Sequence, residues 1–133
     1  MKRATASVST KDPKNSGVRQ VVTREELTEL RGLAEEVRVE DNVRHYLRDL
    51  VRATRSSPLL VLGAGPRAAL HLLVAARWAA ALSGRLFVTP DDVQRMLPDV
   101  LSHRLSLSPE AELDGLDARE VLSRVSSRIE VPR

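Results

Sequence analysis

The segment from Pro66 to about residue 82 carries Leu, Val or Ala on nearly every side of a helical projection, with His71, Arg77 and Trp78 as the larger interruptions. A helix that is apolar almost all round is typical of the buried centre of a protein. Aromatic residues make up only 2% of the chain, so its core must be built mainly of Leu, Val and Ala, which suits packed helices better than strands. The sequence therefore predicts an all-α fold around this helix.

Capping signals and apolar stripes predict two helices before this segment. Thr23 and Glu26 have the spacing of a capping box, in which each side chain bonds the other residue's backbone N–H. The apolar residues that follow at helical spacing are Leu27, Leu30, Leu33, Ala34 and Val37. Glu40 or Asp41 is expected to cap a second helix, which ends at residues 57–58 because the residue before a proline avoids helical geometry. Its single apolar stripe consists of Val43, Tyr46, Leu47, Leu50, Val51 and Thr54.

A fourth helix is predicted after Ser83-Gly84, which should end the central one. Thr89 is the expected N-cap, Pro90 suits the first helical position, and the carboxylates of Asp91 and Asp92 face the positive end of the helix dipole. These two aspartates are therefore explained by capping. Pro98 is expected to kink or divide this helix before His103, because proline lacks the N–H that the helix needs.

The last part of the chain predicts one more helix. Residues 105–117 contain turn formers and short apolar alternation, so we expect a loop or a small hairpin there. Asp117 and Glu120 form a capping pair in front of the apolar residues Val121, Leu122, Val125 and Ile129. The predicted architecture is a helical bundle of about five helices without internal repeats.

The charge distribution separates a basic tail from a neutral body. Residues 1–17 carry four basic residues and one acidic residue, which accounts for the whole net charge of +3. From residue 18 onward, the remaining 17 arginines face 17 acidic residues (21 minus four, and 18 minus one). We interpret residues 1–17 as a disordered basic extension or as residues added by cloning, and residues 18–133 as one helical domain. A neutral body does not favour nucleic-acid binding.

Several other classes of protein are disfavoured by composition. The chain has no cysteine, which excludes disulfides and thiolate metal sites and fits a reducing compartment. No apolar stretch reaches the roughly 20 residues that cross a bilayer, and the first residues lack the apolar core of a signal peptide. We expect a cytoplasmic protein with no membrane contact. His45, His71 and His103 are scattered over three predicted helices, so we expect no metal site.

The stretch "LLVLGAGPRAAL" (residues 59–70) has the appearance of a dinucleotide-binding turn. Gly63, Gly65 and Ala68 satisfy the glycine pattern, and Leu86–Val88 followed by Asp91 could imitate the second strand and its acidic residue. However, Asp91 lies further on than the pattern requires. The residues before and after this stretch are also mostly helical in pattern, so no sheet is expected for such a strand to join. This interpretation is rejected.

Arg67 offers a simpler interpretation of the same stretch. It follows Gly65 and Pro66 at the start of the central helix, where free N–H groups and a partial positive charge attract phosphate. A guanidinium adds a permanent charge and a planar fork that suits phosphate oxygens. The alternative is a solvated first-turn residue, although a cation at a helix N-terminus is slightly unfavourable without an anion. Arg55 and Arg104 lie near helix ends, where cations satisfy terminal carbonyls, and are expected to be structural.

Four ordered motifs resemble the C-terminal lid of MoxR-type AAA+ ATPases. They are "LVRATRSSP" (50–58), "LGAGPRAAL" (62–70), "SGRLFVTPDDV" (83–93) and "VLSHRLSL" (100–107). Weaker matches at both edges extend the resemblance over residues 21–132. It implies that Arg67 is the sensor 2 arginine, which reaches from the lid to the terminal phosphates of the nucleotide. The sequence departs from the family at Gly65, where serine is usual.

The resemblance also implies partners and a cofactor. In an intact ATPase the lid would close over ATP with Mg²⁺ bound by a P-loop core, with Arg67, Pro66 and Gly65 at the nucleotide. The motor would form a ring homo-oligomer and act as a chaperone on a client that the lid does not identify. No Walker A motif, Gly-x-x-x-x-Gly-Lys-Ser/Thr, occurs in this chain, so the isolated chain is expected to bind no cofactor and to hydrolyse no ATP. The alternative is a helical adaptor module with no nucleotide role.

Overall fold

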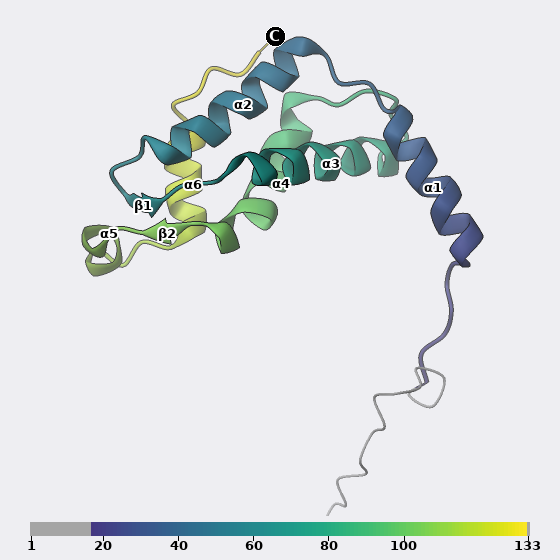
Figure 1. The fold of residues 1–133 in the computed structure, drawn as a ribbon, viewed down its shortest axis with the longest axis horizontal. Helices are drawn as coiled ribbons and strands as arrows, with labels where there is room; N and C mark the ends of the chain where they lie inside the picture. Colours follow the sequence, from purple (N-terminus) through teal and green to yellow (C-terminus); the bar gives the residue numbers. More distant parts are fainter. Residues whose placement is uncertain (1–16, 133) are drawn as a thin grey trace, which may run out of the picture. The chain divides into compact units, whose positions relative to one another are not determined.

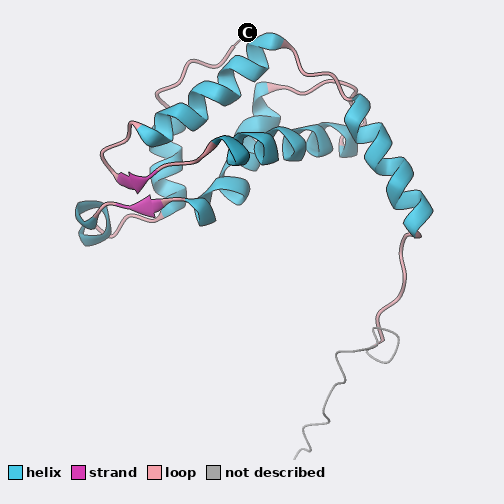
Figure 2. Ribbon diagram, in the orientation of Figure 1, coloured by secondary structure: helices cyan, strands magenta, loops and turns pink. Residues whose placement is uncertain are grey.

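The computed structural model describes residues 17–132, in which it has six α-helices, one 3₁₀-helix and two short strands (Figures 1 and 2). The chain divides into two units, residues 1–31 and residues 32–133. The predicted basic tail, residues 1–17, lies almost wholly outside the described residues. The elements in chain order are α1 (Arg24–Glu36), α2 (Asp41–Arg55), β1 (Leu60–Leu62), α3 (Pro66–Leu82), α4 (Pro90–Leu101), η2 (Ser102–Arg104), β2 (Ser106–Leu107), α5 (Pro109–Leu113) and α6 (Ala118–Ser126).

The start of α1 confirms the predicted capping box. The Thr23 backbone N–H donates to the Glu26 carboxylate at 2.7 Å, and the Glu26 N–H donates to the Thr23 hydroxyl at 3.1 Å. Ala34 is the buried residue of this helix. The remaining members of its predicted apolar stripe within the helix, Leu27, Leu30 and Leu33, are exposed.

The prediction for α2 is confirmed along its buried face. All six residues of the predicted stripe are buried, and the helix ends at Arg55 with Ser56 as its C-cap. Glu40 is the N-cap residue, but its side chain makes no capping hydrogen bond with a described residue, so the capping expected from it is wrong. The helix is instead fixed by its packed apolar face.

Helix α3 has the predicted bounds and a different degree of burial. It ends as expected, with Ser83 as C-cap and Gly84 at a φ of 71°, a conformation that glycine adopts without strain. Its buried residues are Ala68, Leu72, Ala76, Ala79 and Ala80. Leu70, Val74 and Leu82 are exposed, so the prediction of a helix buried on almost all sides is wrong. Helix α3 packs on α2 and α4 with one face and leaves another uncovered.

Helix α4 begins at the predicted N-cap Thr89, which forms a capping box with Asp92, and Pro90 lies in the first turn. It continues through Pro98 to Leu101 and is followed directly by η2, so, of the kink or division expected from Pro98, the division does not occur at this residue. Proline removes one backbone donor from the helix, the one that would bond the carbonyl of Gln94. Because Gln94 is exposed, water can satisfy that carbonyl.

A two-stranded antiparallel sheet joins two distant segments. Leu60 of β1 pairs with Leu107 of β2, and Leu62 pairs with Ser106. The expectation that β1 has no sheet to join is therefore wrong. Residues 105–117, where a loop or a small hairpin is expected, hold β2, which pairs with β1, and the additional helix α5. The pairing brings Leu60 onto α6, where it is buried with Val121 and Val125. No parallel sheet of the dinucleotide-binding kind is present among the described residues.

The core lies among α2, α3, α4 and α6, which Figure 1 shows grouped together. The all-α prediction is confirmed, with six helices where about five were expected. Asp117 and Glu120 form the predicted capping box of α6, which ends at Ser126, so Ile129 lies beyond the helix. Among the described helices, none combines the length and apolarity needed to span a membrane. The largest fully buried side chains are Leu50, Leu72, Leu101, Leu122, Val37, Val93, Val121 and Thr54.

Candidate functional site

The N-terminus of α3 is open to solvent and carries an exposed arginine. Gly65 is the N-cap residue, in an extended conformation (φ −87°, ψ 174°), and it supplies no side-chain cap. Pro66 occupies the first helical position and Arg67 the second; both are exposed. Among the described residues, Arg67 has no carboxylate within salt-bridge distance. A guanidinium and a helix N-terminus at one place, without a neutralising acid, form a setting that suits an anion.

The turn in front of Arg67 lies directly against the end of α2. A Cβ placed on Gly63 would come within 2.7 Å of the Arg55 backbone N and Cα and of the Thr54 backbone C. Only a residue without a side chain permits this approach. In the sequence, Gly63 fits the glycine pattern of a dinucleotide-binding turn. In the structure, its role is to let the turn lie directly against α2.

Two consecutive residues of α2 hold the backbone N–H and C=O of Ala64. The Thr54 hydroxyl accepts a hydrogen bond from the Ala64 N–H at 2.9 Å and donates one to the Val51 carbonyl at 2.7 Å. The Arg55 Nε–H donates to the Ala64 carbonyl at 2.7 Å. We call these contacts of Thr54 and Arg55 with Ala64 the Ala64 clamp. From the sequence, Thr54 is only a member of an apolar stripe, and Arg55 is expected to satisfy a carbonyl at a helix end rather than one in this turn.

A second group of side chains lies one helical turn after Arg67. Arg104 in η2 donates through Nη2 to His71 Nδ1 at 2.9 Å, so it contacts a side chain where a terminal carbonyl was expected. Asp99 lies in the same groove and pairs with Arg119 at 2.8 Å. No group of three or more potential metal ligands occurs in the part of the chain that the structure describes. The groove has a volume of about 540 Å³ and is lined by His71, Val74, Ala75, Asp99, Val100, His103 and Arg104.

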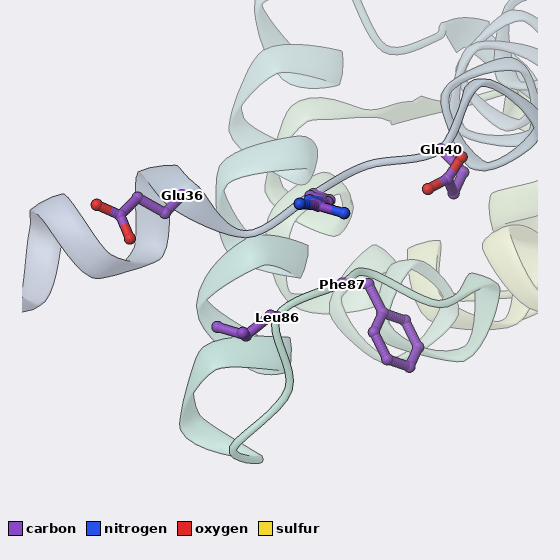
Figure 3. A pocket seen from close by; sticks show the side chains of 5 residues that line it. Glu36, Glu40, Leu86 and Phe87 are labelled. Atoms are coloured by element: carbon purple, nitrogen blue, oxygen red, sulfur yellow. The ribbon is translucent and has the colours of Figure 1, made fainter.

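A larger hollow of about 650 Å³ lies elsewhere, beside the segment that joins α1 and α2 (Figure 3). Its backbone frame is a parallel bridge, in which the Arg38 N–H donates to the Leu86 carbonyl and the Val88 N–H donates to the Arg38 carbonyl, each at 2.9 Å. Leu86 and Phe87 give it an apolar wall, while Glu36 and Glu40 place carboxylates at its rim. Arg38 also lines the hollow, but two carboxylates against one guanidinium make it a poor site for phosphate. The N-terminus of α3 is the better candidate.

The fold matches one family. The chain belongs to the AAA lid domain family, which matches residues 52–125, more than half of its length. Within that family it is a lid of the MoxR type. The matched region contains α3, Arg67 and the Ala64 clamp.

Individual relatives support this assignment. Chaperone MoxR1 of Mycobacterium tuberculosis is 33% identical over 124 residues, covering 86% of this chain and 33% of MoxR1. YeaC, an uncharacterized protein of Bacillus subtilis, is 35% identical over 112 residues, covering 84% of this chain and 35% of YeaC. A crystal structure of a candidate ATPase from Cytophaga hutchinsonii has a TM-score of 0.79 at 26% identity, covering 87% of this chain and 38% of that one. The chain thus spans about a third of the length of these relatives.

Proposed function

We propose that this lid closes over ATP bound by a separate P-loop core and that Arg67 is its sensor 2 residue. Arg67 would contact the terminal phosphates and thereby link the state of the nucleotide to the position of the lid. The observation that carries the proposal is the exposed, acid-free guanidinium in the first turn of α3. Such a charge stabilises the developing negative charge of phosphoryl transfer without taking part in covalent chemistry.

The residues around Arg67 fit a phosphate group. Gly65 leaves the N-terminus of α3 uncapped, and no described heavy atom lies within 4 Å of a Cβ placed there. The phosphates can therefore approach the Arg67 backbone N–H, the first of the helix after Pro66, as well as the guanidinium. ATP brings its Mg²⁺ from the core, since the residues at this end of α3 include no carboxylate that could hold a cation.

The P-loop domain that would complete the nucleotide site is also part of the proposed function. The relatives named as chaperone and ATPase are about three times as long as the region they share with this chain. The apolar side chains of Leu27, Leu30 and Leu33 on α1 are exposed, as expected for a surface that another domain covers. We propose that the complete motor forms a ring homo-oligomer and remodels a client protein, as the name of MoxR1 suggests.

The test is the ATPase in which this lid is joined to its P-loop core. Replacing Arg67 by Ala is expected to lower kcat for ATP by roughly 10²-fold, the scale seen when one preorganised charge donor is removed. Arg52→Ala is the matched control, because Arg52 is an exposed arginine on α2 outside this site. Circular dichroism of both variants should show unchanged helix content. Normal turnover in Arg67→Ala would exclude the sensor 2 role.

The chain alone provides a second measurement. We expect it to show no ATP hydrolysis above a buffer blank, because the catalytic half of the site would come from the core. ATP hydrolysis by the purified chain that survives in the Arg67→Ala variant would contradict the assignment.

A further inference from the structure

The Ala64 clamp lies three residues before Arg67, and little of the intervening chain is free to turn. Pro66 has its φ fixed by the pyrrolidine ring. Gly65 is the one flexible joint, because it has neither a Cβ nor a capping side chain. The contacts that hold the Ala64 backbone therefore set the direction in which α3 begins. They set the position of Arg67 in the same way.

The backbone N–H and C=O of Ala64 are both held by the same short stretch of α2. Thr54 is 1% exposed and its hydroxyl is engaged on both sides, by the Ala64 N–H and the Val51 carbonyl. A buried hydroxyl with one donor and one acceptor partner cannot rotate without losing a bond. Gly63 restricts the turn further, because a Cβ placed on it would come within 2.7 Å of backbone atoms of Thr54 and Arg55. The end of α2 and the start of α3 are thus one rigid corner.

Arg55 stabilises this corner through the geometry of a hydrogen bond, and its charge alone does not explain that contact. It uses Nε, the N–H on the inner side of the guanidinium, to bond the Ala64 carbonyl at 2.7 Å. The side chain has no carboxylate partner within the described residues, so an ion pair does not hold it. A lysine at this position would keep the charge but would have no N–H at the position of Nε.

We propose that Thr54 and Arg55 are positioning residues for Arg67, fixing the backbone of Ala64 so that the sensor arginine points at the nucleotide. This inference rests on the proposed function of Arg67 and assigns a role to two residues outside α3. Misplacing a charge donor by about 1 Å is enough to lower a rate by roughly 10²-fold, so a positioning contact has a measurable effect.

The experiment compares variants of the ATPase that joins this lid to its P-loop core. Arg55→Lys is expected to lower kcat for ATP by about tenfold with less than about a twofold change in KM, because the contact that it misaligns acts mainly in the transition state. Thr54→Val, which removes the hydroxyl, should lower kcat in the same way, whereas Thr54→Ser should retain it. Arg52→Lys, in the same turn of α2, is the matched control and should be unchanged.

The decisive comparison is the double variant Arg55→Lys/Arg67→Ala. If Arg55 acts through Arg67, the double variant has the kcat of Arg67→Ala alone, since residues that act as a unit are not additive. Effects that multiply would overturn the positioning role, and so would a normal kcat in Arg55→Lys. A normal kcat in Arg67→Ala would instead show that the proposed function itself is wrong. In the chain alone, hydrogen exchange of the Ala64 amide should accelerate in Thr54→Val and not in Thr54→Ser; equal exchange would contradict the clamp.

Discussion

Arg85 and Asp92 form a bidentate ion pair across the turn that joins α3 to α4. Arg85 Nη1 and Nη2 donate to the two carboxylate oxygens of Asp92 at 2.7 and 2.6 Å. The same carboxylate accepts from the Thr89 backbone N–H and hydroxyl, each at 2.9 Å, and it is only 3% exposed. Burial alone would raise the pKa of Asp92, but the hydrogen bonds from Arg85 and Thr89 outweigh it and lower the pKa to about 2.

This lowered pKa predicts a loss of stability in acid. The pKa of Asp92 is below its unfolded value, so its contribution is fully present above about pH 4 and is lost as the pH falls toward about 2. A difference of this size corresponds to about 2 kcal/mol in the free energy of unfolding. Urea unfolding across that range should show it, and the Asp92→Asn variant should lose less stability over the same range than the parent chain. Equal losses in both proteins would contradict the prediction.

A second prediction concerns the two sides of α3. Leu72 is 0% exposed in the core, whereas Leu70 on the same helix is 62% exposed. Leu72→Ala removes buried methyl groups and leaves a cavity, which should lower the free energy of unfolding by about 2–5 kcal/mol. Leu70→Ala should change it by less than about 0.5 kcal/mol, because the side chain is already in water. Similar losses in the free energy of unfolding at both positions would contradict the difference in burial between the two faces of α3.

The sequence predicted the helices well because their signals are local. The stripe of α2 and the capping boxes at Thr23, Thr89 and Asp117 depend on residues within one or two turns of each other. The pairing of Leu60 with Leu107 depends on residues far apart in the chain, and strands of three and two residues carry no periodicity to detect. Composition likewise shows that α3 is apolar, but not which of its faces another element covers.

The same distinction applies to the candidate site. Arg67 could be singled out because proline and arginine follow a glycine at the start of a long apolar segment. The Ala64 clamp could not, because its bonds join the end of one helix to a turn that precedes the next. A threonine closing an otherwise apolar stripe, just before an arginine, was the available signal. This signal can be interpreted only when the contact between the end of α2 and the turn before α3 is known.

Gly63 gives a third prediction. A Cβ at this position would lie 2.7 Å from backbone atoms of Thr54 and Arg55, which cannot move aside as a side chain would. Gly63→Ala should therefore force the turn away from α2 and lower the free energy of unfolding by about 1–3 kcal/mol. Gly32→Ala is the control. No described heavy atom lies within 4 Å of its Cβ, and alanine in place of a helical glycine should stabilise the chain by roughly 0.5–1 kcal/mol. Thermal unfolding of the two variants should shift in opposite directions, and a shift of Gly63→Ala upward would refute the close contact.

Gly65→Ser is expected to stabilise the chain slightly without disturbing the site. The backbone at Gly65 already has the extended geometry of an N-cap residue, and no described heavy atom lies within 4 Å of a new Cβ. The serine oxygen can accept from the N–H of the second or third helical residue, Arg67 or Ala68, which should raise the free energy of unfolding by a few tenths of a kcal/mol. Gly65→Ala is the matched control, because it adds the same Cβ without an acceptor and should give no such gain. Chemical denaturation of the three proteins measures the difference. If alanine stabilised the chain as much as serine does, the gain would come from restricting the unfolded chain rather than from capping α3.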